Sequence, residues 1–274
     1  MILVGANVGV AKVLAEALPI AVIAFARCVL AVVVLLPLAR ALEGVPRLSR
    51  TTLANLFWQA VFGTALYNAG LLAGLRLTTA LEGGLVLATL PAVVALGAWA
   101  LLRERLTGPQ MLAAGLAGAG MAAITLARLG ATDGGSWLGN LLVFGGVCGE
   151  AAYVLLARRM GAVPVVTASL WMQVFSAAVL LPFAAPGLGA LGGLDAGLGA
   201  LLVFHALTAS VLCLLLWYLG LRSVPAGVAG VFTVFLPASA AVVAVAFLGE
   251  TFSAVHAAGF ALMLLSVLLV GVRR

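Results

Sequence analysis

Three ionisable side chains stand inside apolar stretches of the sequence, where a charge can bind a ligand or carry a proton: Arg27, Glu150 and His205. An ionised group in hydrocarbon costs roughly 2.5–3.5 kcal/mol on insertion scales, so each of these residues needs a reason to be there. Glu150 lies deepest, and we interpret it as a cavity charge or as a proton carrier that couples transport to a proton gradient. The alternative is a structural ion pair with a cation such as Arg27.

Arg27 and His205 offer two further kinds of binding chemistry. The guanidinium group of Arg27 could hold a carboxylate through two parallel hydrogen bonds, although snorkelling toward water explains this residue equally well. The imidazole of His205 could titrate near neutral pH, but a lone histidine among helices is more often only a hydrogen-bonded polar group. We keep His205 as a candidate cavity residue.

Uncharged polar and amphipathic side chains accompany these groups inside the apolar stretches. They could contact a polar substrate, or they could join one helix to another by hydrogen bonds. The tryptophans could equally anchor helices at the membrane interface. The candidate residues of a substrate cavity are Asn7, Tyr67, Asn68, Glu150, Tyr153, Trp171, His205 and Trp217.

Charges near the ends of apolar stretches predict structural roles. Lys12 and Glu16 are four residues apart, which is the spacing at which opposite charges pair on a helix. Glu82 lies near the start of an apolar stretch. We expect water to reach Glu82 there, as a solvated charge at the rim of the protein.

Patterns typical of enzymes and metal sites are missing from the sequence. His205 and His256 lie in different apolar segments, and neither a Gly-x-Ser-x-Gly nor a His-Glu-x-x-His pattern occurs. Cys28, Cys148 and Cys213 lie singly in apolar surroundings, without the spacing of a metal site or a disulfide framework. We therefore predict no catalytic residue, no metal and no cofactor.

The composition indicates the medium in which these residues act. Of the 274 residues, 65% are hydrophobic and only 8% are charged, and the mean hydropathy is +1.29. Soluble domains are about half apolar and about a quarter charged, so we expect an integral membrane protein. The net charge of +6 is spread over segment ends and forms no basic cluster, which argues against nucleic-acid binding.

Clusters of Arg, Pro, Gly and Asp divide the sequence into apolar segments, and crossing a bilayer takes roughly 20 apolar residues per helix. The prediction is an all-α integral membrane protein. Ala15-Glu16-Ala17 mimics a signal-peptide cleavage site, but the basic region expected before it is missing. The ten predicted transmembrane helices span residues 1–17, 20–42, 52–74, 79–101, 107–128, 137–159, 164–186, 198–221, 225–248 and 252–272.

The sequence repeats itself at a fixed offset of 146 residues. Gly74-Leu75-Arg76 returns as Gly220-Leu221-Arg222, Leu90-Pro91-Ala92 returns as Leu236-Pro237-Ala238, and Glu104 returns as Glu250. We infer two five-helix repeats, residues 1–130 and 137–274, with a hinge around Arg128–Trp137. Pro91 and Pro237 fall near the centres of equivalent helices, where proline bends a helix. They could be paired gating kinks or kinks that serve packing alone.

Basic residues at segment ends orient the two repeats. Ten Lys or Arg residues fall on one side and three on the other, so the richer side and both termini are predicted to be cytoplasmic. Because five crossings are an odd number, the second repeat must enter from the opposite side. The prediction is an inverted-topology repeat, an architecture that can alternate between outward-open and inward-open states.

The stretch from Gly74 through Pro91 to Thr107, and its partial copy Phe247-Leu248-Gly249-Glu250-Thr251, resemble the drug/metabolite transporter superfamily, specifically its EamA-type exporters. The first copy departs from the family pattern, because Arg103 stands where a glycine is usual before the glutamate. This departure leaves the local turn open. The resemblance implies export of small metabolites through a cavity lined by the first, third, fourth, sixth, eighth and ninth helices. Amino-acid exporters of the YddG type are the group that it suggests first.

These inferences favour a secondary transporter of the bacterial cytoplasmic (inner) membrane that exports a small metabolite by alternating access. Few charges lie within the apolar segments, so a zwitterionic or amphipathic molecule is expected, and an amino acid first. A multidrug exporter or an exporter of other metabolites is the alternative. A membrane-embedded enzyme is less well supported, and a channel lacks a filter-like loop. The expected partners are the small-molecule substrate and the lipid bilayer, and we expect a monomer.

Overall fold

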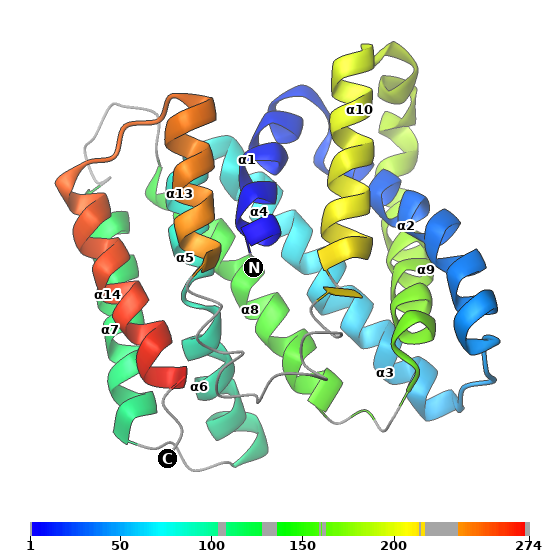
Figure 1. The fold of residues 1–274 in the computed structure, drawn as a ribbon, viewed down its shortest axis with the longest axis horizontal. Coiled ribbons are helices and arrows are strands. Elements are labelled where there is room, and N and C mark those ends of the chain that lie inside the picture. The colour runs from blue at the N-terminus through cyan, green and yellow to red at the C-terminus, as the bar shows by residue number, and fades with distance from the viewer. Residues whose placement is uncertain are drawn as a thin grey trace.

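The computed structural model describes residues 2–103, 108–127, 136–158, 160, 163–213, 215–216 and 235–271. Within these ranges the chain is helical and contains no β-strand, and its helices pack side by side in a bundle (Figure 1). Five of the described segments are long and apolar enough to cross a membrane, and shorter apolar helices accompany them. The prediction of an all-helical protein is therefore confirmed for the described residues, and the apolar segments are consistent with a multi-pass membrane protein, whereas the count of ten crossings stays a prediction.

The helices follow the apolar segments of the sequence closely. The first part of the chain forms α1 (Ile2–Ala17), α2 (Ile20–Glu43), α3 (Arg50–Ala60), the π-helical segment η1 (Val61–Leu66), α4 (Tyr67–Leu77), α5 (Ala80–Leu87), α6 (Leu90–Leu102) and α7 (Gly108–Ala127). The second part forms α8 (Trp137–Arg158), α9 (Val165–Ala184), the 3-10 segment η2 (Ala185–Gly193), α10 (Ala196–His205), the π-helical segment η3 (Ala206–Leu212), α13 (Phe235–Leu248) and α14 (Ala254–Gly271). The predicted hinge around Arg128–Trp137 lies almost entirely outside the described residues.

Polar caps define several helix starts, because the first backbone N–H groups of a helix have no partner within it. The Ser49 hydroxyl accepts a hydrogen bond from the Thr52 N–H at the start of α3. Asp195 stands 146 residues later and caps α10 in the same way. The carboxylate of Glu43, from the end of α2, accepts the N–H groups of Val166 and Thr167 at the start of α9.

Two π-helical segments interrupt the α-helices at equivalent places in the repeat. The segment η1 separates α3 from α4, and η3 follows α10 at a position about one repeat length later. A π-turn widens the helix by one residue and frees backbone groups, and such turns are frequent at functional sites. Nearby side chains bond to backbone carbonyls at both segments. Asn68 donates a hydrogen bond to the carbonyl of Thr64 (2.6 Å), and Thr208 donates one to the carbonyl of Phe204 (2.6 Å).

The predicted kink at Pro91 is a break between two helices. The N–H groups of Ala88 and Thr89 bond to the carbonyls of Leu85 and Val86, so the chain tightens into a turn before α6 begins. Proline lacks the N–H that would continue the α-helical ladder, which explains the break at this point. Pro237 lies in the first turn described of α13, and both its side chain and the residues before Phe235 lie outside the described set.

The left-handed turn after α6 is retained despite the departure of this sequence from the family pattern. Arg103 has a φ of +53°, and Gly249, which occupies the same place after α13, has a φ of +67°. Glycine adopts this conformation without strain, whereas the Cβ of Arg103 makes it costly. The question that the sequence left open is thereby answered: the turn keeps its shape in both copies, at a local cost in the first.

Glycines bring two helices of the bundle into backbone contact. A Cβ on Gly70 of α4 would lie 2.6 Å from the backbone nitrogen of Gly146 on α8, and a Cβ on Gly139 would lie 2.9 Å from the Gly74 carbonyl. Small residues at helix interfaces allow this approach in membranes. The helices further pair as α1 with α13, α8 with α6 and α5, α2 with α9, and α7 with α14.

Candidate functional site

The middle of the bundle holds a group of polar side chains, which we name the central polar group: Asn7, Arg27, Tyr67, Glu150, His205 and Thr208. Each of these residues lies about seven to thirteen positions from one end of its helix. At 1.5 Å per residue this is roughly 10–20 Å. The ends from which we count are Ala17, Ile20, Leu77, Trp137 and Ala196. The hydrocarbon core of a bilayer is about 30 Å thick, so in helices that cross it these positions fall near the middle of the span.

Asn7, His205 and Thr208 are joined directly. Asn7 Oδ1 lies 2.8 Å from His205 Nδ1, and Asn7 Nδ2 lies 3.0 Å from Thr208 Oγ1. Because an amide oxygen can only accept, the Nδ1 of His205 must be the donor, and a neutral imidazole then presents Nε2 as an acceptor. The structure therefore brings together two of the sequence-predicted residues, from α1 and α10, and adds Thr208, which the sequence did not single out.

Arg27 provides the positive charge of the group. Its side chain is only 9% exposed, and its Nε has no hydrogen-bond partner within the described part of the chain. Its charge acts on Tyr67, Glu150 and His205, so α2 brings a cation to the residues that the sequence predicted for the cavity. Sequence reasoning left Arg27 outside the cavity because the family resemblance does not place the second helix on it.

Glu150 is the acidic residue of the group. It lies on α8, and its side chain is partly buried. Among the described residues no hydrogen bond or ion pair joins Glu150 to Arg27, although the two charges interact electrostatically. The alternative of a closed structural ion pair between them is therefore not what the structure contains.

The remaining predicted cavity residues have different surroundings. Tyr67 is deep and half-buried, whereas Asn68 is fully buried and bonded to its own helix. Tyr153 packs on the backbone of η1, where a Cβ on Gly63 would lie 2.6 Å from it. Trp171 packs against the ring of Phe175 with centroids 5.6 Å apart. Trp217 lies outside the described residues.

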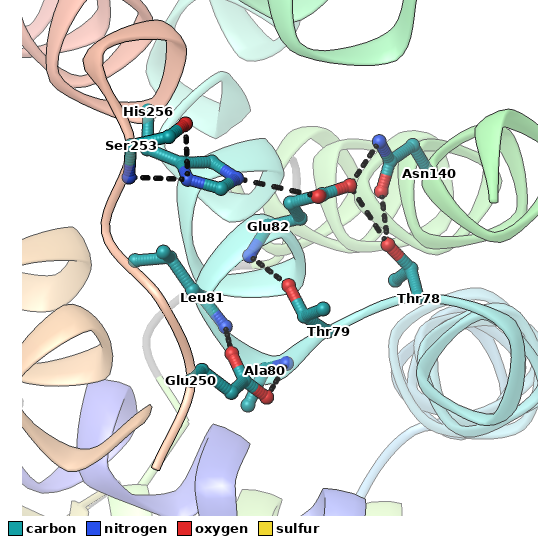
Figure 2. Close-up of polar contacts among 9 residues, drawn as sticks. All are labelled: Thr78, Thr79, Ala80, Leu81, Glu82, Asn140, Glu250, Ser253 and His256. Atoms are coloured by element: carbon teal, nitrogen blue, oxygen red, sulfur yellow. Dashed lines mark hydrogen bonds and ion pairs between the residues drawn. The ribbon is translucent and has the colours of Figure 1, made fainter. Parts of the chain in front are cut away.

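A second polar cluster lies where α5, α8 and α14 begin, and we name it the Glu82 network: Thr78, Glu82, Asn140 and His256. Glu82 Oε2 lies 2.8 Å from Asn140 Nδ2 and 3.0 Å from Thr78 Oγ1, and Glu82 Oε1 lies 3.3 Å from His256 Nε2 (Figure 2). The prediction that Glu82 is a solvated rim charge is wrong, because its side chain is completely buried. Neighbouring helices cover it, and their amide, hydroxyl and imidazole groups replace water.

Further charges hold the same end of the bundle together. The Glu250 carboxylate accepts the N–H groups of Ala80 and Leu81 at 2.8 Å each, which caps α5 from the segment between α13 and α14 (Figure 2). Lys12 donates to the carbonyls of Leu75 and Thr78 and pairs with Glu16 at 3.0 Å, as the spacing predicted. The recurrence of Glu104 as Glu250 was the one sequence signal that marked Glu250.

Arg76 completes this end of the bundle. Its guanidinium group donates to the carbonyls of Ala15 and Leu18 at 2.7 Å each, where α1 ends. No group of three or more His, Cys, Asp or Glu side chains that could hold a metal occurs among the described residues.

An apolar helical bundle that encloses a group of hydrogen-bonded polar side chains is the architecture of a polytopic membrane protein. The EamA-like transporter family model matches residues 1–126 and again residues 137–272. The chain therefore belongs to the EamA-like transporter family of the drug/metabolite transporter superfamily, as its motifs indicated, and it is a membrane transporter.

One relative and one solved structure are similar to this chain over most of its length. The uncharacterized transporter YetK of Bacillus subtilis (strain 168) is 33% identical over 270 residues, which cover 95% of this chain and 81% of that protein. A crystal structure superposes with a TM-score of 0.60 over 98% of this chain and 92% of the other, at 18% identity. At that identity, the second comparison supports the fold alone.

Proposed function

We propose that this protein is a secondary transporter that exports a small zwitterion, first of all a neutral amino acid, across the bacterial inner membrane. The observation that carries the proposal is the pair of opposite charges in the central polar group. Arg27 is buried with an Nε that lacks a partner among the described residues, and Glu150 is partly buried on α8. The two are near enough to interact but are not bonded to each other.

A zwitterion satisfies both charges at once. Its carboxylate would accept hydrogen bonds from the guanidinium group of Arg27, the geometry that a planar fork favours. Its ammonium group would donate to Glu150, and His205 Nε2 would offer one more acceptor. The apolar surroundings strengthen these contacts, because charge interactions are screened less there than in water.

Alternating access between the two repeats is the second part of the proposal. Its support is that equivalent elements of the two repeats pack in equivalent ways. α1 packs on α13, and its equivalent α8 packs on α5 and α6. The equivalent helices α2 and α9 pack on each other, and so do α7 and α14. The family model also matches the chain twice. The proposed arrangement is ten crossings in two inverted five-helix repeats, residues 1–130 and 137–274, with both termini cytoplasmic and with Pro91 and Pro237 as gating kinks.

Transport by purified protein in proteoliposomes tests the proposal. We expect uptake of at least one neutral amino acid down its gradient, and strong loss of uptake in Arg27→Gln and Glu150→Gln. Glu16→Gln is the matched control, because Glu16 is exposed and pairs with Lys12, which is not a member of the central polar group. Absence of flux for all twenty amino acids would sink the amino-acid version and leave drug-like compounds or other metabolites as cargo.

Glu150 is also the coupling residue that the sequence predicted, and this stays a prediction. If Glu150→Gln transports as well as the wild type, and an imposed pH gradient changes the transport rate of neither protein, then proton coupling through Glu150 is wrong.

A further inference from the structure

A chain of hydrogen bonds runs from a backbone carbonyl of α1 through Asn7 to His205 on α10. Asn7 Nδ2 lies 2.8 Å from the carbonyl oxygen of Leu3 and 3.0 Å from Thr208 Oγ1. Asn7 Oδ1 lies 2.8 Å from His205 Nδ1. The side chains of Asn7, His205 and Thr208 are all more than nine-tenths buried, so each needs its hydrogen bonds from within the protein.

The Leu3 carbonyl determines how the Asn7 amide is turned. A carbonyl oxygen can only accept, so the amide atom that lies 2.8 Å from it is the NH₂ group. The opposite orientation would bring two oxygens into contact with no proton between them. Asn7 Oδ1 therefore faces His205, and because an amide oxygen also only accepts, the proton of the imidazole is on Nδ1.

Thr208 agrees with this direction of donation. Its hydroxyl lies 2.6 Å from the carbonyl oxygen of Phe204 and 3.1 Å from Asn7 Oδ1, so its single proton goes to the nearer carbonyl. The second amide proton of Asn7 then meets a lone pair of Thr208 Oγ1 at 3.0 Å. The protons of this group are thereby assigned, and the Asn7 amide is fixed on both sides.

The second ring nitrogen of His205, Nε2, is turned away from α1. The helix α10 packs against α1 and also against α2, which carries Arg27, and the charge of Arg27 acts on His205. A second cation near Arg27 in apolar surroundings is unfavourable, so the imidazole is neutral and Nε2 is an acceptor. Within the described ranges of the chain no group bonds to Nε2.

The equivalent place in the other repeat holds different side chains. At the offset of 146 residues Asn7 corresponds to Tyr153, and His205 corresponds to Gln59. There Tyr153 packs beside Gly63 of η1. A contact that only held helices together would serve both repeats equally well. Its presence in one repeat favours a role with the substrate, because a zwitterion has a different charge at each end.

We propose that Asn7 is a positioning residue, which holds His205 in the tautomer whose Nε2 accepts an N–H group of the substrate. The substrate class is then a zwitterion with N–H donors on its cationic nitrogen, such as an amino acid, and not its fully N-methylated form. That betaine has the same two charges, so charge alone does not exclude it. This inference rests on the proposed transport function and adds the feature by which the site selects among zwitterions.

Nitrogen-15 NMR of protein labelled in histidine reads the tautomer directly. The sequence contains two histidines, so the signals that disappear in His205→Asn belong to His205. We expect the proton on Nδ1 in the wild type and a mixture of tautomers in Asn7→Leu. A wild-type proton on Nε2, or unchanged His205 signals in Asn7→Leu, would overturn the role of Asn7 whether or not the protein transports amino acids.

Calorimetric titration with a transported amino acid tests the role of Nε2 in binding. His205→Asn keeps an amide N–H near the place of Nδ1 but has no acceptor at the place of Nε2, whereas His205→Gln has an amide oxygen there. We expect affinity to fall about tenfold in His205→Asn and to stay near the wild-type value in His205→Gln. Asn7→Leu should weaken binding similarly. Because Asn7 acts through His205, the double variant Asn7→Leu/His205→Asn should bind no more weakly than His205→Asn.

The fully N-methylated amino acid should bind the wild type about tenfold more weakly than the amino acid, or weaker still. Glu16→Gln should match the wild type for both ligands. Equal affinity of the wild type for both, unchanged affinity of His205→Asn for the amino acid, or additive losses in the double variant would overturn the inference. Absence of binding for all twenty amino acids would instead refute the proposed substrate, and the tautomer seen by NMR would still decide on Asn7.

Discussion

Replacing Arg27 by glutamine tests the proposed carboxylate site most sharply. Hydrogen bonds to a charged group contribute about 1.5–3 kcal/mol, and removal of one partner of a buried charge pair costs about 3–5 kcal/mol. Because the Arg27 side chain is only 9% exposed, we expect a loss of about 3 kcal/mol for binding of the substrate carboxylate. That loss raises the dissociation constant by about 100-fold.

Calorimetric titration of the purified protein in detergent can separate this effect from a general loss of structure. The ligands are a transported neutral amino acid and the amine obtained by removing its carboxylate. Arg27→Gln should bind the amino acid about 100-fold more weakly than the wild type, while its affinity for the amine is unchanged. Glu150→Gln should lose affinity for both, because both carry the ammonium group. Equal weakening of amino acid and amine by Arg27→Gln would refute the reasoning.

Three further predictions concern the fold. Gly70→Ala should destabilise the protein by about 1–3 kcal/mol, because its Cβ would lie 2.6 Å from a backbone nitrogen of α8. Gly145→Ala has open space and should not lower the melting temperature, because alanine is the better helix former. Arg103→Gly should raise stability by about 1 kcal/mol, since it removes strain at a φ of +53°, and a lower melting temperature would contradict this. If the repeats are inverted, the thiol of Leu77→Cys should react with an impermeant reagent from outside the cell and that of Ser223→Cys only from inside; labelling of both from one side would exclude the topology.

Most of the helical architecture could be predicted from the sequence, because apolar runs of membrane length have few alternatives to a helix. The prediction for residues 20–42 corresponds to α2 at Ile20–Glu43, and Pro91 marked the break after α5. The π-segments η1 and η3 could not be predicted, since a π-turn inserts one residue without changing the apolar pattern. Their positions became visible only through hydrogen-bond geometry.

The residues of the polar sites could largely be picked out from the sequence by their type, but their burial and their hydrogen-bond partners could not. Glu82 was placed at the rim because it lies near a helix start, but its partners Asn140 and His256 come from 58 and 174 residues away. Burial of that kind is a property of tertiary packing, which local sequence does not report. For Glu250 the signal was internal repetition, a long-range property that a sequence does display.

The most direct test of the central claim is exchange of a radiolabelled neutral amino acid by proteoliposomes that contain the wild-type protein or Arg27→Gln. The account predicts that unlabelled amino acid inside the vesicles accelerates entry of the label for the wild type. It also predicts that entry by Arg27→Gln at low substrate concentration falls to the level of protein-free vesicles. Equal entry by wild type and Arg27→Gln, or no exchange by the wild type with any of the twenty amino acids, would contradict it.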